Sequence, residues 1–349
     1  MKITVALRDA PYEVTLGAGV RHEVSSFIAE VMTRARVAVI ITSPEIRRQA
    51  WFDLSFSIET HVIEVPDGEA AKSLSTLAEV CEQLARAGVS RHDVILGVGG
   101  GAITDLAGFV AAVYLRGVAV LHVPTSVVGQ VDAAIGGKTA VDIAAGKNLV
   151  GAFHQPRGVW CDIETLSTLS DRERVAGMGE VAKCWLLEQR PSSALPAATL
   201  EEFIELSVAL KARIVAADEF EQTGQRALLN YGHTLGHAIE LVALARDTGE
   251  LRHGEAVAIG LAFAARLARA LGRVGDELVD ETDAVLNFFA LPARLGPDFE
   301  VSELLELMAR DKKAHHDLSF VLAGENGCEL VTGIDPELVR EVLEQFQEA

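Results

Sequence analysis

The sequence is poor in cysteine and in positive charge. Its 349 residues include only four cysteines, scattered and without a C-x-x-C pair, so we expect neither a disulfide framework nor a thiolate zinc site. The 31 basic residues are outnumbered by 50 acidic ones, and the resulting formal charge of −19 opposes broad contact with nucleic acid or an anionic membrane. We therefore expect a protein of the reducing cytoplasm that binds neither nucleic acid nor membrane.

Long apolar runs are also missing. None reaches the ~18 residues that a membrane-spanning helix needs. The opening stretch, MKITVALRDAPYEVTLG, alternates apolar and polar side chains like a strand and lacks the continuous apolar centre of a signal peptide. Hydrophobic residues nevertheless make up 49% of the chain, which at this length is enough to fill the cores of two domains.

Two patterns divide the chain near residue 168. Before it, β-branched runs typical of buried parallel strands alternate with helix-like stretches; the runs cover residues 37–41, 61–65, 94–98 and 118–123. After it, the strand signals fade and long amphipathic stretches follow. We predict an α/β domain over residues 1–168 and a mostly α-helical domain over residues 169–349.

A glycine-rich turn follows one of these predicted strands. Residues 94–105, VILGVGGGAITD, place Gly99, Gly100 and Gly101 between a strand pattern and a helix pattern. Glycines at such a turn let the backbone approach a pyrophosphate at the helix N-terminus. The spacing is not G-x-G-x-x-G, so a tight strand-to-helix turn without a nucleotide is the competing interpretation.

Three histidines are concentrated in a short interval. Residues 230–240, NYGHTLGHAIE, place His233 and His237 four apart, on one face of a predicted helix, and His253 opens the next helical stretch in RHGEAV. Catalytic zinc sites typically use three protein ligands and keep one position open. The spacing nominates both His233 and His237 and does not say which is not a ligand. The competing interpretation is a set of hydrogen-bonded histidines on helix faces.

A carboxylate candidate lies in the segment GMGEVAK. Glu180 and Lys183 stand one helical turn apart there, which pairs a possible metal ligand with a possible anion-binding group. A surface ion pair explains the segment equally well.

Taken together, these segments resemble the 3-dehydroquinate synthase family, within the sugar phosphate cyclases, over about residues 35–325. The most specific stretches are GGGAITDLAGFVAAVYLRG, VDAAIGGKTAVDIAAGKNLVGAFHQP, GMGEVAK, RALLNYGHTLGHAIE, RHGEAVAIG and the DKK at residues 311–313. The resemblance implies a Rossmann-like NAD-binding α/β domain followed by a mostly α-helical domain that binds metal and substrate.

The resemblance also implies roles for individual residues. It assigns one divalent metal ion, Zn or Co, to Glu180, His233 and His253. The implied catalytic residues are His237, which transfers protons instead of binding the metal, Lys138, Asn148 and, as a second candidate for proton transfer, Glu221. The implied NAD contacts are Glu69, Lys72, Gly99, Gly100, Gly101, Asp105, Thr125, Ser126, Asp132, Lys147 and Thr168. The implied substrate contacts are Arg116, Asp132, Lys138, Asn148, Lys183, Lys211, Arg226, Asn230 and Lys313.

The activity implied is the conversion of 3-deoxy-D-arabino-heptulosonate 7-phosphate to 3-dehydroquinate and phosphate, a lyase reaction of the shikimate pathway to aromatic amino acids. NAD oxidises the C5 hydroxyl, phosphate is eliminated, C5 is reduced again, and an intramolecular aldol step closes the ring. The lysines and arginines in the substrate set match the carboxylate and phosphate of this sugar acid. We expect the enzyme to act as a homodimer.

The match departs from the family pattern at several places, and two of them bear on the predicted sites. Where the family carries an Asp that contacts the adenosine ribose, this chain reads Thr42, Ser43, Pro44, Glu45, so the contact is either displaced to Glu45 or missing. The segment between His237 and His253 is a few residues longer than the family's, and we expect the extra residues to alter the loop between these two histidines.

Other functions share much of this pattern. Sister cyclases that make 2-epi-5-epi-valiolone, 2-deoxy-scyllo-inosose or aminodehydroquinate use the same fold, NAD and metal. Arg226 and Asn230, together with the DKK segment, favour a carboxylate-bearing substrate, which leaves the amino variant as the nearest alternative. A glycerol-dehydrogenase-like oxidoreductase and a non-catalytic paralogue are the other two alternatives.

Overall fold

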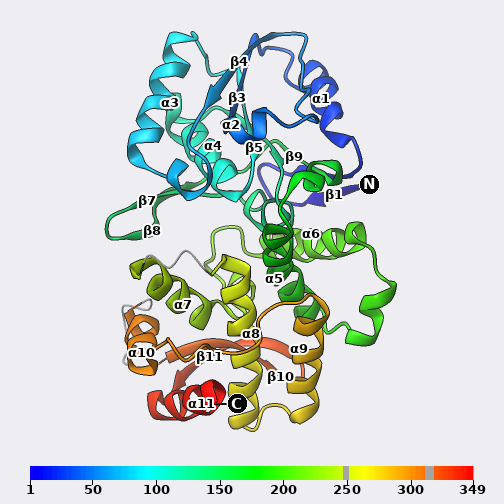
Figure 1. Cartoon of the computed structure of the whole chain (residues 1–349). Helices are drawn as coiled ribbons and strands as arrows, with labels where there is room; N and C mark the ends of the chain where they lie inside the picture. The colour runs from blue at the N-terminus through cyan, green and yellow to red at the C-terminus, as the bar shows by residue number, and fades with distance from the viewer. Residues whose placement is uncertain (247–250, 311–317, 349) are drawn as a thin grey trace. The chain divides into compact units, whose positions relative to one another are not determined.

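The computed structural model of the chain describes residues 1–246, 251–310 and 318–348 (Figure 1). The chain forms two compact units, the first made of Met1–Ser170 and Val208–Phe220, the second of Asp171–Ser207 and Glu221–Ala349. The domain boundary expected after residue 168 stays a prediction, and it did not anticipate that the segment Val208–Phe220 lies with the first unit. Lys313 and the rest of its DKK segment lie outside the described residues.

Seven strands of the first unit form one sheet in the order β1-β2-β9-β6-β5-β3-β4. β1 is antiparallel to β2, and all other neighbours are parallel. These strands are β1 (Lys2–Val5), β2 (Tyr12–Gly17), β3 (Val37–Thr42), β4 (Glu59–Glu64), β5 (Val94–Gly99), β6 (Ala119–Pro124) and β9 (Gly158–Asp162). Four of them coincide with the predicted runs, so the predicted parallel α/β fold is confirmed.

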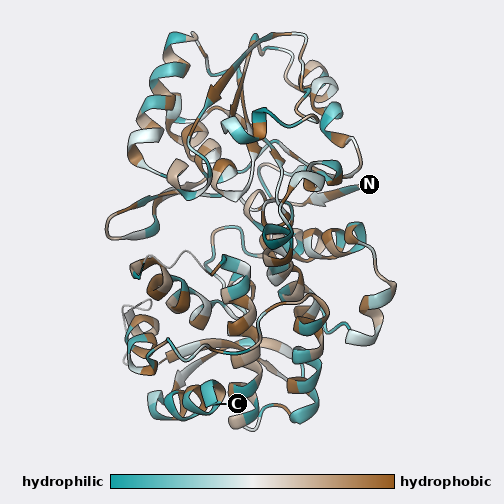
Figure 2. Cartoon of the chain, viewed as in Figure 1, coloured by the Kyte–Doolittle hydropathy of each residue, from teal (hydrophilic) through white to brown (hydrophobic). Residues whose placement is uncertain are grey.

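Successive side chains of a strand point to opposite faces of the sheet. Both faces of this sheet carry apolar side chains, and helices cover both. On β3, Val37, Val39 and Ile41 belong to one core with α3 and α4, whereas Ala38 and Ile40 belong to a second core with α1. Figure 2 shows the resulting hydrophobic colour along the strands and the mixed colours of the helices. The helical segments are η1 (Val20–His22), α1 (Glu23–Val31), α2 (Pro44–Arg47), η2 (Gly68–Ala71), α3 (Leu74–Arg86), α4 (Gly101–Val113), η3 (Tyr114–Arg116), the π-helical η4 (Gly129–Ala133) and η5 (Ile163–Thr168).

A separate antiparallel hairpin extends from the first unit. It consists of β7 (Lys138–Ile143) and β8 (Gly146–Phe153). Its β7 strand packs against α4, and the backbone N–H of Asp142 donates to the carbonyl of Lys72 at 2.9 Å. The hairpin therefore carries Lys138, Lys147 and Asn148 on an element tied to the parallel-sheet domain.

The second unit is built mainly of helices. Helix α8 is its centre: it packs against α5, α7 and α9, and its side chains are buried on most sides. The elements are α5 (Asp171–Leu187), η6 (Ser192–Ala197), η7 (Arg226–Asn230), α7 (His233–Ala245), α8 (His253–Ala270), α9 (Asp276–Phe288), α10 (Val301–Arg310), β10 (Leu318–Gly324), β11 (Gly327–Ile334) and α11 (Pro336–Glu348). Helix α6 (Leu200–Ala217) begins in the second unit and ends in the first. The β10–β11 hairpin was not predicted.

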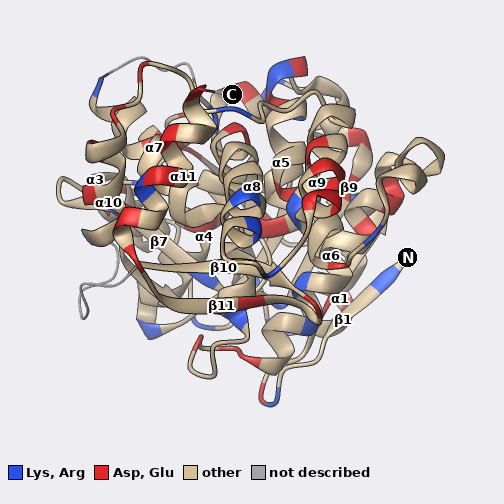
Figure 3. Cartoon of the chain, turned by 90° about the horizontal axis from the view of Figure 1, so that it is seen from below, with Lys and Arg blue, Asp and Glu red and all other residues tan. Residues whose placement is uncertain are grey.

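Among the described residues, no helix is both long and apolar enough to cross a membrane. Figure 3 shows Asp and Glu on many helices, α9 among them, with Lys and Arg scattered between. The structure thus distributes the net negative charge over many elements.

Candidate functional site

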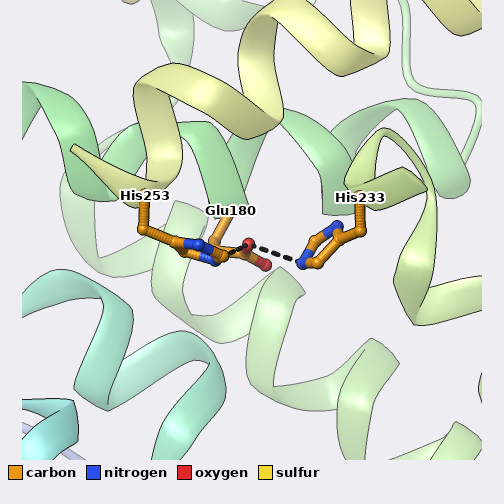
Figure 4. A group of neighbouring side chains, drawn as sticks. All are labelled: Glu180, His233 and His253. Carbon is orange, nitrogen blue, oxygen red and sulfur yellow. Dashed lines mark hydrogen bonds and ion pairs between the residues drawn. The ribbon is translucent and has the colours of Figure 1, made fainter. Parts of the chain in front are cut away.

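Three donor side chains converge in the second unit. Glu180 lies in α5, His233 begins α7 and His253 begins α8, and one ligand atom from each lies within 4.8 Å of the others. Glu180 Oε1 is 3.4 Å from His233 Nε2 and 3.2 Å from His253 Nε2. In Figure 4 the two imidazoles approach the carboxylate from opposite sides. Residues far apart in sequence thus present one oxygen and two nitrogens to a single point.

Glycines beside the ligands allow the three helices to approach so closely. A Cβ on Gly254, the neighbour of His253, would lie 1.7 Å from the carbonyl oxygen of Ala176 in α5. A Cβ on Gly179, the neighbour of Glu180, would lie 2.2 Å from the carbonyl oxygen of Gly254. Both distances are far shorter than any real contact, so α5 and α8 can lie this close only because Gly179 and Gly254 have no Cβ.

Each imidazole also makes a contact through its other ring nitrogen, Nδ1. His233 Nδ1 lies 3.1 Å from the carbonyl oxygen of Tyr231, and His253 Nδ1 lies 3.0 Å from Glu240 Oε2. A carbonyl oxygen can only accept a hydrogen bond, so His233 Nδ1 carries the proton and its Nε2 is the nitrogen with a lone pair. This is the arrangement in which histidines bind metal ions in proteins.

The electrostatics of the group favour a positive charge at its centre. Glu180 is 1% exposed; burial would raise the pKa of its carboxyl, but attraction to Lys183 and His233 outweighs burial and holds the pKa well below its ordinary value. Its Oε2 lies in ion-pair contact with Lys183 Nζ and accepts no hydrogen bond from the described residues. Burial would lower the pKa of His253, yet the carboxylates of Glu180 and Glu240 raise it to about 10. An ionised, buried carboxylate facing two imidazole nitrogens fits a divalent cation.

His237 lies beside this group and is not part of it. Its ring centroid is 5.2 Å from that of His233 and 6.4 Å from that of His253. Its side chain is exposed, whereas His233 is buried. The helical spacing correctly placed His233 and His237 on one face of α7, but the second imidazole of the donor group comes from α8.

In the first unit, the glycine turn joins β5 to α4. Gly99 ends the strand, and a Cβ there would lie 2.6 Å from the side chain of Ile103, so close packing of strand and helix requires glycine. Gly100 is the N-cap of α4, and a Cβ on Gly101 would lie 3.1 Å from Ala133. Steric packing by itself explains part of this motif, and its role in holding NAD stays a prediction.

A polar cluster lies near this turn. Lys72 Nζ donates to Asp105 Oδ2 at 2.7 Å and to Asn148 Oδ1 at 2.5 Å, and it lies 4.0 Å from Glu69 Oε2. Burial raises the pKa of Asp105 to about 6, although the Lys72 ammonium acts in the opposite direction. Asn148 adopts a left-handed backbone with φ 56°, fixed by its N–H donating to Asp142 at 2.7 Å. Glu69, Lys72 and Asp105, which are predicted to contact NAD, thus lie beside Asn148, which is predicted to contact the substrate.

The remaining predicted residues are placed as follows. Lys211 Nζ donates to the carbonyl and to Oδ1 of Asp132, both at 2.6 Å. Thr168 accepts a hydrogen bond from Trp51 Nε1 at 3.0 Å, and Ser126 Oγ accepts one from Gly129 N–H at 3.1 Å. Buried positions are taken by Thr125, Lys183 and Arg226; Lys147 is half-buried, and exposed positions are taken by Arg116, Lys138, Glu221 and Asn230.

The segment that lacks the family's ribose Asp forms a helix cap. Ser43 Oγ accepts from Ile46 N–H at 3.4 Å as N-cap of α2, and Glu45 is exposed in the first turn. Whether Glu45 contacts a ribose stays a prediction.

Sequence reasoning missed two partners of the donor group, the carbonyl of Tyr231 and the carboxylate of Glu240. A backbone carbonyl leaves no signal in a sequence. Glu240 did leave one: it lies seven residues after His233 and three after His237, which puts all three on one face of α7.

Comparison with known proteins agrees with this geometry. Residues 62–176 match the N-terminal domain of 3-dehydroquinate synthase, and residues 177–314 match its C-terminal domain. A protein named "Putative aminodehydroquinate synthase" from Amycolatopsis mediterranei (strain S699) is 48% identical over 347 residues, covering 99% of this chain and 94% of that protein. A 3-dehydroquinate synthase from Corynebacterium pseudotuberculosis (strain C231) is 43% identical over 320 residues, covering 87% and 86% of the two chains.

A solved structure shares the whole fold. A 2-deoxy-scyllo-inosose synthase complexed with carbaglucose-6-phosphate, NAD+ and Co2+ matches with a TM-score of 0.86 at 26% identity, covering 99% of this chain and 100% of that one. Fold and donor group together define a protein of the sugar phosphate cyclase class. The sequence matches are more specific: the chain belongs to the 3-dehydroquinate synthase family. The predicted family, fold class and type of enzyme are thereby confirmed.

Proposed function

We propose that the chain converts 3-deoxy-D-arabino-heptulosonate 7-phosphate to 3-dehydroquinate and phosphate, and that it depends on NAD and one divalent metal ion. The observation that carries this proposal is the convergence of Glu180, His233 and His253 within 4.8 Å, in a chain that matches both 3-dehydroquinate synthase domains. The relatives named 3-dehydroquinate synthase support the substrate, and the cyclase structure with NAD+ and Co2+ supports the cofactors.

The donor set suits Zn2+ or Co2+. One carboxylate and two neutral imidazoles are ligands of catalytic zinc sites, which leave a position for substrate oxygen. When bound, the metal ion polarises the C5 oxygen of the substrate, and NAD supplies the hydride acceptor at the same carbon. Glu180, His233 and His253 hold the ion, and the ion pair with Lys183 keeps the buried Glu180 carboxylate ionised.

His237 is proposed to move the proton of the C5 hydroxyl. Its ring lies beside both imidazoles of the donor group while remaining exposed. A base in that position is needed because oxidation of the alcohol removes a proton as well as a hydride. Glu221, whose backbone is left-handed with φ 57°, is the second candidate for proton transfer.

The cationic residues are proposed to bind the carboxylate and phosphate of the substrate. In the second unit, Arg226 and Lys183 are almost fully buried, and in such surroundings their charges interact strongly with an anion. In the first unit, Lys72 Nζ donates to Asn148 Oδ1, so the amide NH2 of Asn148 is proposed to serve as a hydrogen-bond donor to the substrate. Arg116, Asp132, Lys138, Lys211 and Asn230 complete the described substrate set, and Lys313 lies outside the described residues.

Aminodehydroquinate synthesis is the second candidate function. It is favoured by one observation, the 48% identity to the Amycolatopsis protein over 99% of this chain. The two substrates differ at one heteroatom, so the same donor group and cations serve both. Comparing kcat/KM for the heptulosonate phosphate and for its amino analogue decides between them.

The proposed function is tested by phosphate release from the heptulosonate phosphate with catalytic amounts of NAD, with and without a chelator. We expect many turnovers per NAD, loss of activity with chelator and its return when metal is added back. Stoichiometric accumulation of NADH would instead indicate an oxidoreductase of the glycerol-dehydrogenase type. No phosphate release at all would exclude the proposed reaction. The homodimer also remains a proposal, and sedimentation equilibrium tests it.

A further inference from the structure

The donor residue His253 is held between two carboxylates. It is the first residue of α8, and the segment just before it includes residues 247–250, which lie outside the described residues. Its Nε2 lies 3.2 Å from Glu180 Oε1, and its Nδ1 lies 3.0 Å from Glu240 Oε2. The two contacts fix both the position and the rotation of the ring.

Glu240 reaches His253 from another helix. It lies in α7, on the face that also carries His233 and His237, and its side chain is 16% exposed. The Glu240 contact therefore joins α7 to the first turn of α8 on the far side of the longer segment.

We propose that Glu240 is a positioning residue for the metal site: its carboxylate accepts a hydrogen bond from His253 Nδ1–H and so keeps Nε2 directed at Glu180 as the metal-binding nitrogen. The proposal rests on the metal function proposed above for Glu180, His233 and His253. Carboxylates behind metal-bound histidines orient the ring and increase its basicity.

The two histidines differ in their need for such a partner. His233 is 8% exposed and takes its Nδ1 acceptor from the backbone of Tyr231, two residues earlier. The side chain of His253 is 35% exposed and stands at a helix end, so packing restricts its rotation less. A side-chain acceptor from a neighbouring helix supplies the missing restraint. Only the partner of His253 can therefore be removed by substitution.

The test compares Glu240→Ala with the matched control Glu255→Ala in metal-free protein. Glu255 supports the same first turn of α8, accepting from Arg252 N–H at 2.7 Å and contacting Arg172, whereas the ring nitrogens of His253 contact Glu180 and Glu240. Co2+ affinity is measured by chelator competition, and the visible absorption spectrum of the Co2+ form reports the ligand geometry. Thermal unfolding of each metal-free variant reports stability independently of the metal.

We expect Glu240→Ala to weaken Co2+ binding about 10- to 100-fold and to alter the cobalt spectrum. Glu240→Gln keeps an acceptor for Nδ1 and should recover part of the affinity and the wild-type spectrum, whereas Glu255→Ala should bind Co2+ like the wild type. The proposal is overturned if Glu240→Ala keeps wild-type affinity and spectrum, or if Glu255→Ala loses as much affinity. If the wild-type chain binds no stoichiometric Co2+, the proposed metal function itself fails, which is a distinguishable result.

Discussion

The two polar clusters of the molecule differ in where their positive charge comes from. In the first unit, Lys72 lies among Asp105, Asn148 and Glu69 and supplies the cation itself. In the second unit, Lys183 contacts Glu180 Oε2, while Glu180 Oε1 faces two imidazole nitrogens. The first cluster contains its own cation, whereas the second presents converging donors. This difference supports a metal ion in the second unit, while the NAD contacts in the first unit stay a prediction from the family resemblance.

The largest effect on turnover in a variant that keeps its metal is expected from His237→Ala. The residue lies beside the donor group without belonging to it, so the variant should keep its metal while turnover falls by about 10²- to 10⁴-fold. Metal analysis of the purified protein and the phosphate-release assay check the two halves of this expectation. A variant that purifies without metal would make His237 a ligand.

Glu180→Ala should lose the metal and also destabilise the metal-free protein. It removes the buried partner of Lys183, itself 1% exposed, and breaking a buried pair costs about 3–5 kcal/mol. Urea denaturation of the metal-free protein measures the loss. The control is Asp280→Ala, at an exposed position on α9, which should stay within about 0.5 kcal/mol of the wild type. Equal stability of the two variants would mean that the Glu180 pair is not important for folding.

Gly254→Ala tests the close approach of α5 and α8. The added methyl would overlap the carbonyl of Ala176, so the helices must separate, at a cost of about 1–3 kcal/mol, and His253 must move. We expect lower stability and weaker metal binding together. Gly296→Ala is the control, since a Cβ there makes only ordinary contacts at 3.9 Å. If Gly254→Ala binds metal like the wild type, helix spacing does not position the ligand.

Asp105→Asn tests the cluster around Lys72 in the first unit through the dependence of the free energy of unfolding on pH. The pKa of Asp105 in the folded protein, about 6, is above its ordinary value of 3.8, so the stability linked to its proton is present at low pH and lost as pH rises through 6. Relative to the variant, the wild type should lose on the order of 2 kcal/mol between pH 4 and pH 7. Denaturation curves at several pH values measure this difference. A constant difference across that range would contradict the raised pKa.

Much of the fold could be predicted because the parallel strands are buried on both faces and read as continuous β-branched runs. The β10–β11 hairpin was missed, although Asn326 and Gly327 form the dipeptide that most strongly favours a tight hairpin turn. This two-residue signal is short and lies among long helical patterns, which dominate this half of the sequence.

The donor group could be predicted only in part. Spacing along one helix identifies residues that share a face, and it therefore paired His233 with His237. It carries no information on which residues of other helices come near, so Glu180 and His253 followed from the family resemblance. The packing of α5 against α8 at Gly179 and Gly254 brings these ligands together, and no periodicity in the sequence reveals it.

The most direct test of the metal assignment is anomalous X-ray diffraction from a crystal of the chain grown with Zn2+. We predict one strong peak about 2.0–2.2 Å from a carboxylate oxygen of Glu180 and from Nε2 of His233 and His253. His237 should lie beyond bonding distance of that peak. A peak bonded to His237 in place of His253, or a Zn2+ ion bound only elsewhere in the chain, would contradict the assignment.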